Sequence, residues 1–255
     1  MSDAPDLGDI TVVDLLAIGP HPDDIEIGMG GTVAKHVALG LRVGLCDLTA
    51  GEMGSNGTVE ERIAEAEAAR VVFGAEWRIN LRLPDRRLGT APDHALRIVS
   101  LVRAARPRVI AIPHWSDRHP DHVAASQLAA DAIFSAGLRR FSAEGEAWKP
   151  ESVCYYFIND SATPSFVIDV SGHYETKRRA LACHASQFRP ASPGAVSTRL
   201  TSSRFSQLIE SRDAQFGALC DVEFAEGFVV KQPLLRPHLL RHESRNSLTE
   251  QTTKA

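Results

Sequence analysis

The sequence predicts an α/β protein whose mostly parallel sheet is flanked by helices on both faces. Short apolar segments alternate with longer helical patterns along the first half of the chain, which is the order of βαβ units. The pattern becomes less regular after about residue 150, which indicates a C-terminal elaboration. The 255 residues show no internal repeat, so we predict a single domain over 1–235. The polar stretch 236–255 is predicted to be a mobile tail.

Each predicted element follows from its hydrophobic pattern. The predicted strands are the apolar segments 12–18, 42–48, 77–83, 108–113, 153–158, 166–170 and 224–230. The predicted helices are residues 28–39, 58–73, 93–105, 119–137, 174–187 and 203–217. Thr58 is followed three residues later by Glu61, which is the capping-box pattern at a helix start.

Composition and charge exclude several classes of protein. Lys and Arg number 28 against 32 Asp and Glu, so a net charge of −4 predicts no nucleic-acid partner. No apolar run is long enough to cross a membrane, and the polar first ten residues resemble neither a signal nor a transit peptide. A cytoplasmic location is therefore expected. The four cysteines form no CxxC pair and are expected to be free, buried thiols.

Histidine and aspartate gather in two loops that follow predicted strands. The first loop reads His21-Pro22-Asp23-Asp24, and the second, 114–122, ends in His119-Pro120-Asp121-His122. Ligands of an open parallel sheet bind outside the carboxyl ends of its strands, so the two loops should meet at one edge. A single turn of this kind is usually only a loop, but two at the same edge indicate a site.

The residue types in these loops suit a catalytic zinc site. Catalytic zinc takes three protein ligands, from imidazole or carboxylate groups, and keeps a further position open. His21 and Asp24, three residues apart, provide two ligands, and either His122 or His119 can provide the third. Asp23, beside a ligand but not itself one, is the candidate general base.

The remaining groups of the second loop suit supporting roles. His119 is the candidate to stabilise the oxyanion or to donate a proton to a leaving amine. Asp121 is the candidate carboxylate that holds the second nitrogen of that imidazole.

These two motifs resemble the LmbE/PIG-L family of zinc-dependent N-acetylglucosaminyl de-N-acetylases. The resemblance runs from about residue 12 to 230, and further matching stretches are 46–49, 55–58, 62, 83–86, 134–137 and 225–228. It is nearest to the bacillithiol-biosynthesis branch, which deacetylates N-acetylglucosaminyl-malate. The resemblance implies a Rossmann-like fold and a homo-oligomer, a trimer or hexamer.

The resemblance also assigns roles to residues. It implies Zn²⁺ ligation by His21, Asp24 and His122, with Asp23 as general base and His119 as catalytic histidine.

The chain departs from the family at one position. Some relatives place a tyrosine just before the second motif, where this chain has Asp117 and Arg118, so zinc and His119 would stabilise the oxyanion. Arg62, Arg118 and Asn56 are the predicted contacts to a small-molecule N-acetylglucosaminide substrate.

Three alternatives remain open from the sequence. The substrate could be another N-acetylglucosaminide: a mycothiol-type conjugate, an antibiotic precursor or a chitooligosaccharide. A non-catalytic Rossmann protein that binds a sugar or nucleotide is the alternative of another class. However, 28–31 fails the dinucleotide pattern because Val33 stands at its third glycine position, and close helix–sheet packing explains these glycines better. A metal sensor would need a fourth ligand, for which only His114 is spare.

Overall fold

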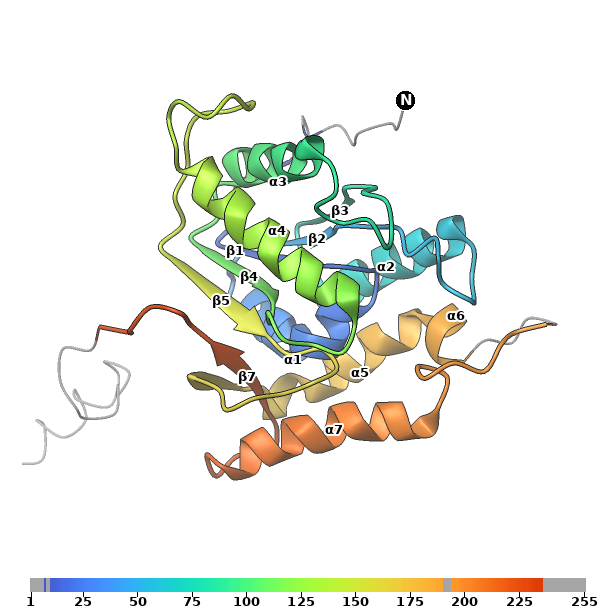
Figure 1. Cartoon of the computed structure of the whole chain (residues 1–255). Coiled ribbons are helices and arrows are strands. Elements are labelled where there is room, and N and C mark those ends of the chain that lie inside the picture. Colours follow the sequence, from blue (N-terminus) through green and yellow to red (C-terminus); the bar gives the residue numbers. More distant parts are fainter. Residues whose placement is uncertain (1–6, 8–9, 190–193, 236–255) are drawn as a thin grey trace, which may run out of the picture.

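Within the residues that the computed structural model describes (7, 10–189 and 194–235), seven strands form one sheet in the order β3-β2-β1-β4-β5-β7-β6 (Figure 1). β1 to β5 are parallel, whereas β7 is antiparallel to both β5 and β6. The order 3-2-1-4-5 is that of a Rossmann-type sheet, so the predicted α/β class is confirmed. The strands are β1 (Leu15–Gly19), β2 (Val43–Asp47), β3 (Trp77–Asn80), β4 (Val109–Pro113), β5 (Ser152–Tyr156), β6 (Phe166–Asp169) and β7 (Ala225–Val229).

Helices cover both faces of the sheet (Figure 1). Alternate residues of β1 enter opposite core layers, with Leu16 and Ile18 in one and Leu15 and Ala17 in the other. The first layer lies under α3 (Pro92–Ala105) and α4 (Pro120–Ala136). The second layer lies under α1 (Asp24–Ala38), α2 (Val59–Phe73), α5 (Tyr174–Cys183) and α7 (Ser203–Ala218), with the short helices η1 (Ser171–His173) and α6 (Ala185–Phe188) beside α5.

Two predicted helices differ from the structure. α1 begins at Asp24 rather than near residue 28, and it is broken at Met29, where φ is −149°. The glycine-rich sequence interrupts the helical pattern, so the pattern predicted only the part beyond the break. The predicted helix 174–187 is two helices, α5 and α6, which are separated at His184.

The break in α1 exposes backbone groups that another element satisfies. The carboxylate of Glu226, on β7, accepts hydrogen bonds from the backbone N–H groups of Gly31 and Thr32, at 2.9 and 2.6 Å. Gly31 and Thr32 follow the non-helical Met29 and so lie at the start of a new helical segment, where a carboxylate is the favoured acceptor. The second half of α1 is therefore capped by a residue about 195 positions away.

The glycines of α1 serve close packing, as expected. A Cβ atom at Gly28 would lie 2.2 Å from Cδ2 of Tyr156, and one at Gly31 would lie 2.7 Å from Cβ of Val170. Tyr156 belongs to β5, so the absence of a side chain at Gly28 lets α1 approach the sheet.

We expect Gly28→Ala to lower the free energy of unfolding by about 1–3 kcal/mol, because the added methyl overlaps Tyr156 in a filled core. Urea unfolding measures the change. Gly172→Ala is the matched control, since a Cβ there meets nothing within 4 Å, and its effect should stay within about 0.5 kcal/mol. Equal effects of the two variants would contradict this explanation of Gly28.

The expectation of four buried thiols is right for two of them. Cys46 and Cys154 are buried, but Cys183 is half-buried and Cys220 is exposed, and all four are free. No helix in the described part of the chain is long and apolar enough to cross a membrane. The predicted tail, 236–255, lies outside the described residues, and the domain boundary at residue 235 stays a prediction.

Candidate active site

The two His/Asp motifs meet where the direction of chain winding reverses. β1 and β4 are neighbours in the sheet, and the helices that follow them, α1 and α4, lie on opposite faces (Figure 1). The loops after two such strands diverge and leave a crevice at their carboxyl ends. His21-Pro22-Asp23-Asp24 lies on one side of this crevice and the 119–122 motif on the other, as the sequence predicted.

Three side chains form a candidate metal centre. His21 Nδ1 lies 3.0 Å from Asp24 Oδ2, and His122 Nε2 lies 3.4 Å from the same oxygen. The three ligand atoms all lie within 4.8 Å of one another. Burial raises the pKa of Asp24, but His122 and His21 hold it well below its usual value, so the carboxylate is ionised. Two imidazole nitrogens and one carboxylate oxygen are a donor set that fits Zn²⁺.

A carboxylate holds the other nitrogen of each histidine. His122 Nδ1 lies 3.0 Å from Asp117 Oδ1. His21 Nε2 lies 3.1 Å from Asp85 Oδ1 and 3.5 Å from Asp121 Oδ2. Carboxylates in these positions fix the tautomer and orientation of a metal-binding imidazole. Both histidines therefore present a defined nitrogen to Asp24.

His119 is held by the start of α4 rather than by a carboxylate. It is the N-cap residue, and its Nδ1 accepts a hydrogen bond from the backbone N–H of Asp121 at 3.2 Å. The neutral ring then carries its proton on Nε2. We expected the Asp121 carboxylate to contact this ring. Instead it accepts hydrogen bonds from the backbone N–H and Nη1 of Arg86, and it lies near His21.

Asp23 occupies a strained and buried position. Its φ of 116° lies in a region that only glycine adopts readily. Burial raises the pKa of its carboxyl group to about 6, and the charge of Arg62 opposes this shift. Arg62 Nη2 lies 3.5 Å from Asp23 Oδ2 and donates to the carbonyl of Pro22 at 2.9 Å, while Nη1 donates to the carbonyl of Gly51 at 2.9 Å. Arg62 thus orients Asp23 and its loop; it also lines the cleft, so its contact with substrate stays a prediction.

The other predicted residues divide between the site and the scaffold. Arg118 is exposed and lines the cleft. Asn56 is buried outside it, where its amide binds the backbone of Val196 instead of a substrate. His114, the spare ligand, packs on Trp115 and Phe157, with ring centroids 4.1 and 5.0 Å away.

The cleft over the metal centre has a volume of about 430 Å³. Its walls come from the loops after β1, β2, β3, β4 and β5, from α2 and α6, and from the segment before α7 together with the first turn of α7. Besides the predicted residues, it is lined by Ile27, Met53, Gly54, Asp85, Arg86, Ile158, Asn159, Gln187, Thr198, Arg199, Leu200 and Phe205. Asn159 Nδ2 donates to Asp117 Oδ1 at 3.0 Å, so it supports the partner of His122.

Sequence reasoning assigned no role to Asp85, Asn159 or Arg199. Asp85 could have been found, since it follows the third strand at the same edge of the sheet. Asn159 follows β5 and Arg199 precedes α7, in the irregular part of the chain, where no motif marks them.

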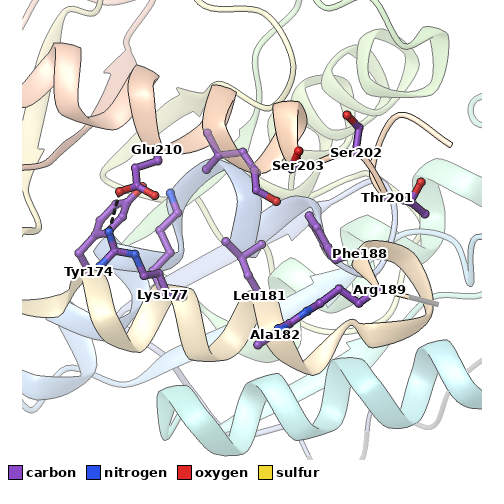
Figure 2. A pocket seen from close by; sticks show the side chains of 13 residues that line it. Tyr174, Lys177, Leu181, Ala182, Phe188, Arg189, Thr201, Ser202, Ser203 and Glu210 are labelled. Atoms are coloured by element: carbon purple, nitrogen blue, oxygen red, sulfur yellow. Dashed lines mark hydrogen bonds and ion pairs between the residues drawn. The ribbon is translucent and has the colours of Figure 1, made fainter. Parts of the chain in front are cut away.

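A second cavity of about 390 Å³ lies between α5 and α7 (Figure 2). Leu181 and Phe188 point into it, and hydroxyl groups of Ser202 and Ser203 lie at its edge (Figure 2). Among the described residues, two His/Asp groups could hold a metal, His21–Asp24–His122 and His21–His119–Asp121, and every histidine of both groups lines the first cleft. The first cleft is therefore the candidate active site.

Comparison with known proteins places the chain among deacetylases. Residues 16–133, which include both motifs, match the family model PIG-L, described as GlcNAc-PI de-N-acetylase. Diacetylchitobiose deacetylase of Thermococcus kodakarensis is 31% identical, over 68% of this chain and 70% of that protein. The 1D-myo-inositol 2-acetamido-2-deoxy-alpha-D-glucopyranoside deacetylase of Rhodococcus opacus is 29% identical, over 71% of this chain and 83% of that protein.

A solved structure extends the similarity over most of the fold. The conserved protein TT1542 from Thermus thermophilus has a TM-score of 0.82 and 38% identity, and the match covers 90% of this chain and 100% of that one. The chain belongs to the PIG-L family and is an amide hydrolase of that family, a carbohydrate de-N-acetylase.

Proposed function

We propose that this protein removes the N-acetyl group from an N-acetylglucosamine conjugate, with Zn²⁺ held by His21, Asp24 and His122. The observation that carries the proposal is the meeting of this ligand set with Asp23 and His119 in one cleft. The names of two relatives, deacetylases of diacetylchitobiose and of an inositol glycoside of N-acetylglucosamine, support this substrate class. A non-catalytic binding protein does not agree with membership of a hydrolase family.

The residues of the cleft divide the proton transfers between them. When bound, Zn²⁺ polarises an amide carbonyl and lowers the pKa of water. Asp23 takes the proton of the attacking water on its carboxylate, which Arg62 orients. The Nε2–H of His119 donates a hydrogen bond to the carbonyl oxygen as negative charge develops there. Asp23 then passes its proton to the departing nitrogen, so acetate and the free sugar amine leave.

We further propose N-acetylglucosaminyl-malate, the bacillithiol precursor, as the substrate. The support is electrostatic, since Arg86, Arg118 and Arg199 all line the cleft. Guanidinium groups bind carboxylates through paired hydrogen bonds, and malate supplies two carboxylates. Among the described contacts, Arg118 and Arg199 have no ion pair, whereas Arg86 pairs with Asp121 at 3.1 Å. Diacetylchitobiose and inositol glycosides carry no carboxylate, so the positive charge of these arginines would form no ion pair with them.

The substrate assignment is tested by acetate release from N-acetylglucosaminyl-malate, diacetylchitobiose and N-acetylglucosaminyl-inositol, on enzyme whose zinc content has been quantified. We expect the highest kcat/KM for the malate conjugate. Arg118→Gln should lower that value roughly 10- to 100-fold, the equivalent of a charge-assisted hydrogen bond, and leave the two neutral substrates nearly unchanged. Equal losses on all three substrates, or preference for a neutral one, would contradict malate recognition.

A homo-oligomer stays a prediction of the family resemblance. Light scattering coupled to gel filtration tests it directly, with a trimer or hexamer as the expected mass and a monomer as the contrary result.

A further inference from the structure

A short segment before α7 separates the two cavities. Residues 198–200 line the candidate active site, and residues 201–203 line the second cavity. Figure 2 shows Thr201, Ser202 and Ser203 at the edge of that second cavity. We call residues 196–202 the partition. Leu200 packs against the second core layer. Because there is a hollow on each side, packing still supports the partition less than it supports a loop on a filled core.

One side chain attaches the start of the partition to the rest of the protein. The Nδ2 of Asn56 donates to the carbonyl of Val196 at 2.9 Å, and its Oδ1 accepts from the N–H of Val196 at 2.8 Å. In the described part of the chain, no other residue outside the partition forms a hydrogen bond with residues 194–200. Asn56 is itself fixed, since it is 7% exposed and its carbonyl accepts from Gln187 Nε2 at 2.7 Å.

Beyond this attachment the partition is internally ordered. Thr201 Oγ1 donates to the carbonyl of Thr198 at 2.9 Å and accepts from its N–H at 2.9 Å. Ser202 then caps α7 by accepting from the N–H of Arg204. The partition therefore behaves as one compact turn. Asn56 holds its start, while its end is placed by α7 and by the contacts of Leu200 with the core and of Arg199 with Phe205.

We propose that Asn56 is a positioning residue for substrate binding: its amide holds the partition so that Thr198 and Arg199 contact the part of the substrate beyond the reacting amide. This inference rests on the proposed function. The groups that act on the amide are held elsewhere, by α1, by α4 and by Arg62. Loss of the Asn56 contact should therefore weaken binding while the chemical step is retained.

The experiment uses the full-length protein with zinc bound. Asn56→Ala removes both hydrogen bonds to Val196, and Asn56→Asp keeps the acceptor but loses the donor. Thr58→Ala is the matched control, because Thr58 caps α2 two residues away and has no hydrogen bond to the partition. The first readout is KM and kcat for the N-acetylglucosaminide of the panel above that has the highest kcat/KM. The second is the rate of tryptic cleavage after the exposed Arg199, which is followed by Leu200.

For Asn56→Ala we expect KM to rise roughly tenfold with kcat within about twofold. Cleavage after Arg199 should accelerate roughly tenfold. Asn56→Asp should give intermediate values of KM and of the cleavage rate, and Thr58→Ala should leave KM, kcat and the cleavage rate unchanged. A fall in kcat at constant KM, or cleavage after Arg199 at the wild-type rate, would overturn the proposal.

The two proposals fail in different ways. If wild-type enzyme releases acetate from no N-acetylglucosaminide, the proposed function is wrong. The cleavage rates then decide by themselves whether Asn56 holds the partition.

Discussion

Replacing Asp23 by asparagine is expected to lower kcat for deacetylation by roughly 10²- to 10⁴-fold, the usual contribution of a general base. The amide has the size of the carboxylate and still accepts a hydrogen bond from Arg62, but it cannot take a proton from water. The metal ligands His21, Asp24 and His122 are unchanged, so zinc content should stay at the wild-type level. Acetate release and metal analysis of the same preparation measure both quantities.

Asp85→Asn is the matched control for this variant. It also converts a buried carboxylate of the cleft into an amide, but Asp85 contacts His21 at 3.1 Å rather than the reacting groups. Replacement of a carboxylate that supports a metal ligand should weaken metal affinity about 10- to 100-fold, and excess zinc should restore activity. If Asp23→Asn retained zinc and deacetylated at the wild-type rate, the role assigned to Asp23 would be wrong.

Replacing Lys177 by methionine is expected to lower the free energy of unfolding by about 3–5 kcal/mol, the usual cost of removing one partner from a buried ion pair. Lys177 Nζ lies 2.6 Å from Asp213 Oδ2 and 2.7 Å from Glu226 Oε1, and all three side chains are fully buried. Without the ammonium group, Glu226 keeps only the two backbone N–H groups of α1, and Asp213 keeps Arg212 and Tyr174.

Arg178→Met is the control for this prediction, because it removes a cation from the next position of the same helix. Arg178 pairs with Glu210 at 2.7 Å, but both side chains are about half exposed, so water screens the pair. Its loss should cost less than about 1 kcal/mol. Urea unfolding measures the free energy of unfolding of both variants. Similar losses of this free energy in the two variants would show that the buried cluster of Lys177, Asp213 and Glu226 adds little to stability.

Much of the fold could be predicted because its signals are local. Apolar runs identified the strands, and the capping box at Thr58 and Glu61 placed the start of α2 correctly. The break in α1 could not be predicted, since it depends on Glu226 and on the close approach of Tyr156, both far away in the sequence.

The same division holds for the candidate site. The His21–Asp24 motif and the 119–122 motif could be joined from sequence, because parallel strands bring their carboxyl ends to one edge. The roles of Arg62 and Asn56 could not be predicted from sequence. An isolated arginine or asparagine looks the same in a sequence whether it contacts a substrate or a backbone carbonyl. Only the fold shows that Arg62 binds Pro22 and Gly51 and that Asn56 binds Val196.

The sequence by itself determined the α/β class, the edge of the sheet that carries the chemistry and the residue types that suit a metal. Those properties follow from hydrophobic periodicity and from spacing within short loops. The tertiary structure decided which carboxylates hold His21 and His122, how Asp23 is oriented and which segments line the cleft. These depend on contacts between residues far apart in the chain, and their geometry is set by packing rather than by any local pattern.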